Sequence, residues 1–311
     1  MEFGVMTEPQ LGMTYDDQLD IARFAERIGL DVFARSDHYG FPGFEDPHAT
    51  DAFASLAGLA RETDRIDLCV LVSPVTFRHP AVIAKSAATI DEMSNGRLIL
   101  GVGTGWMEEE HEQFGLPFPE WGERFSRLEE ALGYLGAAFG RTEGGFDGEH
   151  YRLAPTEVAP GPSGRLPIVV GGSGPRRTPT LAGTHADEYN LMVMPIDDLT
   201  ARVNLARDAA REAGRDPDGL LISIMGGAIV GSDEAAFERN LERVAAADPF
   251  GRSPEALESR FRERGLPVGT AAEARETLAA LAEAGVGRFY LQHFGPFEHD
   301  LLEEMFDSVR A

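Results

Sequence analysis

The amino-acid sequence predicts a closed (β/α)8 barrel with insertions after the fourth and seventh strands. Eight short apolar segments alternate with longer amphipathic segments along the 311 residues, which is typical of βα units that build a parallel sheet. The composition does not change along the chain, so we expect one domain over residues 1–311. A hydrophobic content of 43% is enough for the core of such a barrel. An open, doubly wound sheet is the alternative architecture.

Four strands are expected in the first third of the chain, at residues 2–7, 30–36, 66–72 and 98–102. Helices are expected between them at residues 15–28, 51–61 and 80–93. Gly29 is a stop signal for the first helix, Thr50 or Asp51 can cap the second, and Pro80 opens the third. The alternation then pauses, because residues 107–124 hold several aromatic residues and prolines and predict a packed loop.

The alternation resumes after a helix at residues 123–139 and a segment at 144–162 that contains a hairpin at Asp147-Gly148. The remaining strands are expected at residues 167–170, 186–191, 220–225 and 288–292. The remaining helices are expected at residues 176–183, 196–213, 233–247, 271–283 and 297–309. Residues 248–267 predict a loop-rich insertion after the seventh strand.

The composition also limits the partners. A formal net charge of −24 repels nucleic acid and anionic membrane surfaces, so neither is expected, and a small-molecule substrate is. No segment is long and apolar enough to cross a bilayer, and the N-terminus lacks the basic region and apolar stretch of an export signal. A cytoplasmic location is therefore expected. Cys69 is the only cysteine, which excludes an intramolecular disulfide.

Polar residues and glycines follow several of the expected strands. A parallel barrel collects the carboxyl ends of its strands at one mouth, so Asp37-His38, Thr104-Gly105 and the segment 171–174 should meet there. His38 is the candidate catalytic residue, because an imidazole exchanges protons near neutral pH. Asp37 could fix the tautomer of His38, or it could anchor the loop, because adjacent strand residues point to opposite faces. A histidine with a purely structural role is the alternative interpretation of His38.

The segment Gly171-Gly172-Ser173-Gly174 follows an apolar strand, and Pro175 opens the next helix. Backbone N–H groups at the start of a helix bind anions, and Arg176 and Arg177 would help a phosphate to approach this acidic chain. The alternative is a glycine-rich loop with surface arginines. The GxGxxG fingerprint of dinucleotide-binding folds is absent, which argues against a nicotinamide dinucleotide.

Other kinds of catalytic centre find little support in the sequence. His38, His48 and His111 follow no metal-binding spacing, so no metal site is predicted. The run Glu108-Glu109-Glu110-His111 is interpreted as the solvated start of a helix. The GxSxG motif of a nucleophile elbow is also absent.

Several motifs together resemble the luciferase-like monooxygenase superfamily, and most closely its branch of oxidoreductases that use the deazaflavin coenzyme F420. The resemblance runs from about residue 1 to residue 310. The motifs are the segments 35–38, 73–80, 96–106 with 108–111, 115–119, 123–125 and 171–178.

The resemblance implies an isoalloxazine-like ring across the barrel mouth, with its phosphate near the glycine-rich loop. It places Asp37 and His38 close to the ring and the substrate, and it matches Ser73 and Thr104-Gly105 to ring-contacting positions. It also implies a homodimer and a non-prolyl cis peptide bond within residues 69–73, behind the ring. One position departs from the pattern. The sugar-phosphate dehydrogenases of this branch carry a glutamate base directly after the Thr-Gly pair, where this chain has Trp106.

The sequence and the resemblance together predict an F420-dependent oxidoreductase that transfers a hydride between C5 of the deazaflavin and a small organic substrate. Asp37, Ser73, Thr104, Gly105, the segment 171–174 and Arg176 are the expected cofactor-binding residues. An FMN-dependent monooxygenase that uses dioxygen is the first alternative. A ligand-binding barrel without catalytic activity is the second. Trp106 favours an apolar substrate pocket and argues against a sugar phosphate.

Overall fold

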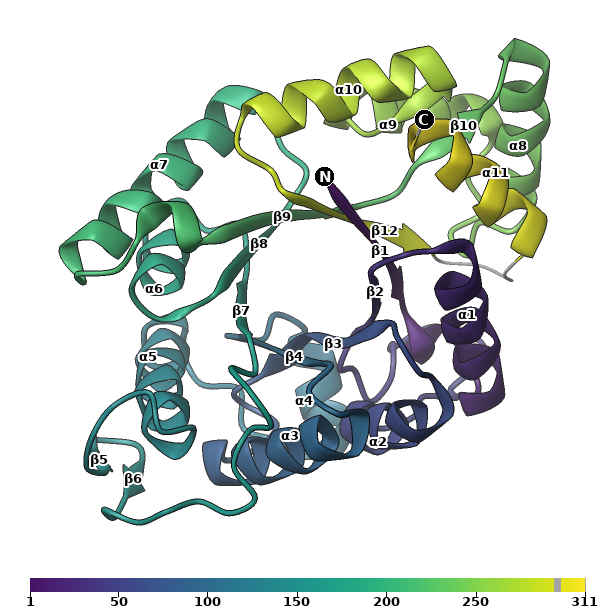
Figure 1. Ribbon diagram of the computed structural model, residues 1–311. Coiled ribbons are helices and arrows are strands. Elements are labelled where there is room, and N and C mark those ends of the chain that lie inside the picture. The colour runs from purple at the N-terminus through teal and green to yellow at the C-terminus, as the bar shows by residue number, and fades with distance from the viewer. Residues whose placement is uncertain (294–297, 311) are drawn as a thin grey trace.

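The computed structural model describes residues 1–293 and 298–310, and eight parallel strands close into a barrel in its centre (Figure 1). Neighbouring strands follow the order β1-β12-β9-β8-β7-β4-β3-β2, and β1 pairs with both β12 and β2. The closed order excludes the open sheet. The barrel strands are β1 (Glu2–Thr7), β2 (Val32–Arg35), β3 (Asp67–Pro74), β4 (Leu98–Gly103), β7 (Ile168–Gly171), β8 (Glu188–Met192), β9 (Leu221–Gly226) and β12 (Arg288–His293).

Helices surround the barrel, and most of them cover the outer faces of its strands (Figure 1). They are α1 (Tyr15–Ile28), α2 (Ala52–Glu62), α3 (Pro80–Ser94), α4 (Glu108–Phe114), α5 (Trp121–Ala138), α6 (Arg177–His185), α7 (Ile196–Glu212), α8 (Glu234–Ala246), α9 (Pro254–Arg264), α10 (Ala271–Glu283) and α11 (His299–Arg310). Two 3-10 turns, η1 (Pro9–Leu11) and η2 (Pro217–Gly219), complete the helical segments described.

The insertions after the fourth and seventh barrel strands are present, but two of their segments are more regular than expected. The packed loop expected at 107–124 contains α4, and the loop-rich insertion expected at 248–267 contains α9. The seventh-strand insertion also pairs β10 (Ile229–Gly231) with β11 (Val268–Thr270). The Asp147-Gly148 hairpin is confirmed by antiparallel β5 (Phe146–Asp147) and β6 (Arg152–Leu153). The expected start of the last helix, residue 297, lies outside the described residues.

Local signals explain where several helices begin and end. In α1 the Thr14 side chain accepts the backbone N–H of Asp17, and the Asp17 carboxylate accepts that of Thr14, so two unpaired N–H groups are satisfied. Gly29 ends the same helix with a positive φ of 89°, a conformation that glycine adopts without steric cost. Asp51, rather than Thr50, caps α2 by accepting the N–H of Ala54 at 2.8 Å.

The core has two layers, because the barrel strands bury both faces. A large cluster lies between the strands and the surrounding helices and includes Phe33, Leu100 and Ile168. A smaller cluster fills the interior of the barrel. Its buried members are Met6, Val32, Ala34, Cys69, Leu71, Ile99, Val169 and Tyr290. The side chains of this interior cluster support the polar residues that follow at the carboxyl ends of the strands.

The third barrel strand carries a bulge that shapes the floor of the mouth. The register between β3 and β4 shifts between Val70 and Ser73, and the Leu71–Val72 peptide bond is cis, as expected for residues 69–73. A Cβ on Gly103 or Gly171 would lie 2.8 Å from a methyl carbon of Val72. These two glycines therefore make room for the Val72 side chain. Gly103 and Gly171 also line the cavity at the mouth of the barrel.

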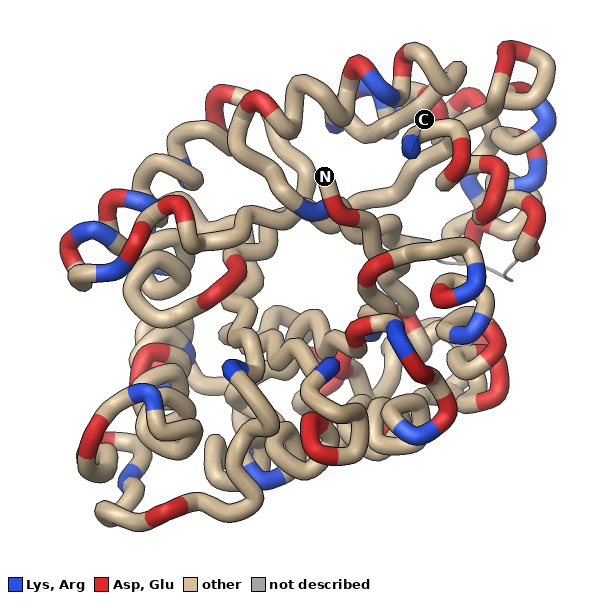
Figure 2. The backbone as a smooth tube through the Cα atoms, in the orientation of Figure 1, with Lys and Arg blue, Asp and Glu red and all other residues tan. Residues whose placement is uncertain are grey.

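Charged residues gather on the outer helices and loops, whereas the inner strands carry few of them (Figure 2). Acidic residues are the majority on this outer surface, in line with 52 Asp and Glu against 28 Lys and Arg. Across residues 1–293 and 298–310, none of the helices combines the length and the apolar character that a membrane span requires.

Candidate active site

A cavity of about 590 Å³ opens at the carboxyl ends of the barrel strands, where a barrel of this kind binds its ligands. The volume is within the usual range for a small-molecule site. Residues at or just after the ends of β1, β2, β4, β7, β8, β9 and β12 line it, together with residues of α4. The structure therefore brings together Asp37, His38, Thr104, Gly105, Gly171, Gly172 and Ser173, as the sequence predicts.

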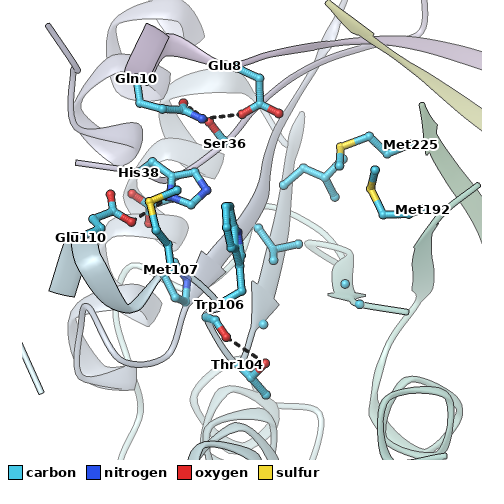
Figure 3. Close-up of a pocket in the computed structure, with 18 of the residues that line it drawn as sticks. Glu8, Gln10, Ser36, His38, Thr104, Trp106, Met107, Glu110, Met192 and Met225 are labelled. Atoms are coloured by element: carbon cyan, nitrogen blue, oxygen red, sulfur yellow. Dashed lines mark hydrogen bonds and ion pairs between the residues drawn. The ribbon is translucent and has the colours of Figure 1, made fainter. Parts of the chain in front are cut away.

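His38 lies at the edge of the cavity and is held there by Glu110 of α4. The Nδ1 of His38 lies 2.8 Å from Glu110 Oε2, so its N–H donates to the carboxylate (Figure 3). The other carboxylate oxygen accepts the backbone N–H groups of Tyr39 and of Gly40, the second at 3.1 Å. With Nδ1 occupied, Nε2 is the ring nitrogen left for a ligand. The Glu110 carboxylate thus fixes both the tautomer of His38 and the loop that follows it.

The surroundings of His38 favour its protonated form. Burial of the imidazole lowers its pKa, but the hydrogen bond that it donates to Glu110 and the negative charges of Glu110, Glu8 and Asp37 raise it more. The net effect is a pKa of His38 above its ordinary value. An imidazole can give up and take back a proton under physiological conditions, so His38 is suited to proton transfer.

Asp37 pairs with Arg78 and anchors the mouth of the barrel. Arg78 forms a two-pronged ion pair with the buried Asp37 carboxylate and also contacts Asp51 at the start of α2. Of the two roles considered for Asp37, the structure favours the anchor. Ser73 is buried behind the cavity wall, and its hydroxyl oxygen lies 3.4 Å from Nη1 of Arg78. Ser73 therefore belongs to the same anchor and does not line the cavity.

The segment after β4 forms another wall. The carbonyl oxygen of Gly105 accepts a hydrogen bond from Arg124 of α5 at 2.6 Å, and Gly105 has a positive φ of 76°. The indole of Trp106 then turns toward His38, with ring centroids 5.6 Å apart and the two rings nearly perpendicular (Figure 3). The hydroxyl of Thr104 lies at the bottom of this wall, near the Gly105 carbonyl.

The glycine-rich loop closes the side of the cavity that is formed by β7. Gly171, Gly172 and Ser173 line the cavity, and the Ser173 hydroxyl accepts the backbone N–H of Met192 at 3.1 Å. Gly174 lies outside the cavity lining, and a Cβ on this residue would lie 2.8 Å from the hydroxyl oxygen of Thr178. Arg176 is exposed and directly precedes α6. Neither of these last two residues lines the cavity.

A row of polar side chains along β1 and β2 was not among the predicted site residues. The Gln10 amide donates to Glu8 at 2.8 Å, and the Ser36 hydroxyl donates to Gln10 at 2.6 Å (Figure 3). Gln292 donates to the other oxygen of Glu8 at 2.6 Å. All four line the cavity. The only local signal for Glu8 and Gln10 was their position just after the first strand.

Glu110 was also missed, because the run 108–111 was interpreted as solvated. Glu108 and Glu109 are indeed exposed, but Glu110 and His111 are buried. His111 donates from Nδ1 to the Met107 carbonyl and therefore accepts the Thr76 hydroxyl at Nε2, both at 2.7 Å. Among the described residues, no group of three or more histidine, cysteine, aspartate or glutamate side chains could hold a metal ion.

Comparison with known proteins places this geometry in a family. The family model of the luciferase-like monooxygenases matches residues 1–288. Two similar curated proteins are F420-dependent glucose-6-phosphate dehydrogenases. The one from Amycolatopsis mediterranei is 33% identical over 65% of this chain and 62% of its own length. The one from Microbacterium testaceum is 36% identical over 56% of this chain and 52% of its own length. The chain thus spans little more than half of the curated relatives it matches.

Solved structures share the fold over almost the entire chain. An F420-dependent secondary alcohol dehydrogenase in complex with an F420-acetone adduct has a TM-score of 0.80 at 21% identity and covers 100% of this chain and 99% of its own. The monooxygenase RslO1 from Streptomyces bottropensis has a TM-score of 0.80 at 21% identity, with 99% and 97% covered. At such identities the likeness shows the fold alone, whereas the family model matches the sequence itself. The chain belongs to the luciferase-like monooxygenase family.

Proposed function

We propose that this protein is an F420-dependent oxidoreductase that transfers a hydride between the coenzyme and a small organic substrate. The curated relatives named above support the coenzyme, and family membership supports the reaction class. The observation that carries the proposal is that His38, Thr104 and the glycine-rich loop line one cavity at the mouth of the barrel. Homodimer assembly, which rests on the resemblance alone, and the cytoplasmic location expected from the sequence belong to the same proposal.

The residues present fit a deazaflavin coenzyme. The cavity offers neutral hydrogen-bonding groups, including the Thr104 hydroxyl and the Asn190 and Gln292 amides, which suit the carbonyl and N–H edge of a flat ring. Val72, seated between Gly103 and Gly171, provides an apolar floor for such a ring. Gly172, Ser173 and the start of α6 with Arg176 would hold the phosphate.

When bound, coenzyme F420 supplies a ring carbon, C5, that accepts or donates a hydride. The chain itself positions the substrate and moves the proton. In alcohol oxidation, His38 takes the hydroxyl proton at Nε2 while the C–H bond of the same carbon breaks with its electron pair and the C=O bond forms. In the reverse direction, the imidazolium returns that proton to the carbonyl oxygen. Glu110 keeps Nε2 directed to the cavity in both directions.

A direct titration tests the proposal. Oxidised F420 is added to the purified protein, and binding is followed by the fluorescence of the coenzyme, with FMN titrated in parallel. Binding of F420 at least tenfold tighter than binding of FMN supports the proposal. Tight FMN binding without F420 binding would instead indicate the monooxygenase alternative. If neither coenzyme binds, the remaining candidate is the barrel without catalytic activity.

A variant can locate the coenzyme phosphate. Arg176→Gln should weaken F420 binding, because the exposed guanidinium next to α6 can pair with a phosphate. Arg152→Gln removes an exposed arginine from the β6 hairpin, outside the cavity, and is the matched control. Equal F420 affinity of the two variants would argue against a phosphate near α6.

A further inference from the structure

We infer that the substrate is an uncharged, largely apolar alcohol or ketone rather than the sugar phosphate that the names of the curated relatives suggest. This inference rests on the proposed function and refines it. Three observations carry it: the charge of the cavity lining, the large apolar side chains at its rim, and the grouping of Glu8, Gln10, Ser36 and His38 across the cavity from two methionines.

The cavity lining carries negative charge and no fixed positive charge. Glu8, Asp37 and Glu110 line it, whereas no lysine or arginine does among the residues that the structure describes. Two arginines behind the cavity wall are already engaged. Arg78 pairs with Asp37 and Asp51, and Arg124 donates to two backbone carbonyls.

A phosphorylated substrate would therefore be poorly accommodated. A phosphate dianion taken from water needs cationic or multiple hydrogen-bonding partners to offset its lost hydration. The acidic side chains that line the cavity are Glu8, Asp37 and Glu110, and like charges at short range repel strongly where water is excluded. Lys85 of α3 is the only lysine of the chain. It donates a hydrogen bond to the Ala159 carbonyl and does not line the cavity.

The rim of the cavity is built from large apolar side chains. Trp106, Trp121 and Phe250 are 66%, 52% and 51% exposed, although each lines the cavity. Met192 and Met225 form the facing wall (Figure 3). Clustered aromatic and thioether groups exposed to solvent at a cavity mouth gain free energy when an apolar ligand covers them.

A group of four polar side chains lies on the opposite side. Glu8, Gln10, Ser36 and His38 lie together there, across the cavity from Met192 and Met225 (Figure 3). Because His38 is the proton-exchanging group among them, the reacting hydroxyl or carbonyl would lie beside its Nε2. The rest of the molecule would extend toward the tryptophans and methionines. A hydroxyl at every carbon, as in a sugar, would leave several polar groups against an apolar wall without partners.

The two tryptophans make occupancy measurable without turnover. Trp106 and Trp121 are the only tryptophans of the chain, and both line the cavity, so intrinsic fluorescence reports directly on a ligand there. The protein, with and without oxidised F420, is titrated with cyclohexanone and with glucose 6-phosphate in phosphate buffer, so that phosphate binding at the glycine-rich loop does not contribute. We expect cyclohexanone to bind at least tenfold more tightly. Equal or tighter binding of glucose 6-phosphate, or reduction of F420 by it, would overturn the inference.

A charge placed in the wall sharpens the test. Met192→Lys should bring glucose 6-phosphate binding up by at least tenfold and weaken cyclohexanone binding. Ile196→Lys adds the same charge at the first residue of α7, where the side chain is 42% exposed and does not line the cavity. This variant should leave both affinities unchanged. Equal effects of the two substitutions would contradict the assignment of this wall. Failure of F420 to bind would reject the proposed function alone, because the titration without coenzyme still reads the substrate class.

Discussion

Glu110 and His38 lie 72 residues apart in the sequence and share a hydrogen bond of 2.8 Å at the edge of the cavity. The carboxylate comes from the first turns of α4 and the imidazole from the loop after β2. Because Glu110 is buried and also accepts two backbone N–H groups, its position is fixed on several sides. The pair therefore fixes the position of an imidazole whose pKa is raised by its surroundings.

The pH dependence of catalysis should report this pair. Alcohol oxidation needs neutral His38, so kcat/KM should rise as the pH increases through the raised pKa of the imidazole. Glu110→Gln removes the charge that stabilises the imidazolium, so the pKa falls and the rise should move to lower pH. Ketone reduction, which needs the imidazolium, should decline at a lower pH in the same variant. Profiles of kcat/KM in both directions measure these shifts.

A neighbouring carboxylate provides the control. Glu109 lies on the same short helix but is exposed, so Glu109→Gln should leave both profiles in place. If Glu110→Gln lowered the rate at every pH by the same factor, without moving the profile, its role would be structural only.

His38 itself should be required for turnover and dispensable for coenzyme binding. Removing a positioned acid–base group usually costs a factor of about 10² to 10⁴ in rate. We expect a loss of this size for His38→Ala in steady-state assays with a secondary alcohol and F420, with the F420 affinity nearly unchanged. His48→Ala removes an exposed histidine outside the cavity and should behave like the parent protein. Full activity of His38→Ala would favour the structural interpretation of this histidine.

Much of the barrel could be predicted from local patterns. The helix Tyr15–Ile28 was predicted with both its ends from its amphipathic pattern and from Gly29, and Thr14 and Asp17 add a capping signal at its start. The eight strands were predicted because both faces of each strand are buried, so that the apolar segments are nearly continuous. Capping signals were also present at α9, where Ser253 and Pro254 precede the helix and Gly265 ends it. That helix could have been predicted and was overlooked.

The missed site residues have a different cause. Nothing in the sequence 108–111 distinguishes Glu110 from the exposed Glu108 and Glu109, because its burial results from the packing of α4 against the loop after β2. Glu8 gains its partner Gln292 only when the first and last barrel strands pair. Contacts between segments so distant in the chain leave no periodic pattern. Sequence reasoning therefore located the mouth of the barrel but not all the side chains that meet there.

The Arg78–Asp37 pair should be the main structural support of the mouth. Asp37 is 1% exposed, so Arg78→Leu would leave a buried carboxylate without its cationic partner. Loss of one member of a buried ion pair typically costs about 3–5 kcal/mol, and urea unfolding should show a decrease in the free energy of unfolding of that order. Adding Asp37→Asn should recover part of the loss, because the remaining buried group is then neutral. A double variant as unstable as Arg78→Leu would show that the loss comes from the packing of Arg78 instead.

The packing of Val72 makes the glycines of β4 sensitive to substitution. A Cβ on Gly101 would overlap the Val70 carbonyl oxygen and approach Val72 Cγ1 to 2.7 Å, and a backbone oxygen within a sheet cannot move aside. Gly101→Ala should therefore lower the free energy of unfolding by about 1–3 kcal/mol or more, as overpacked core positions do. Gly136→Ala is the matched control: this glycine lies inside α5 with open space around it, so alanine should stabilise the protein by roughly 0.5–1 kcal/mol. Urea unfolding curves of the two variants give the comparison. If Gly101→Ala does not fold, Gly103→Ala replaces it in the comparison. A Cβ on Gly103 would approach the movable Val72 side chain to 2.8 Å, so this variant should lose less stability. Equal stability of Gly103→Ala and the parent protein would refute the packing role of these glycines.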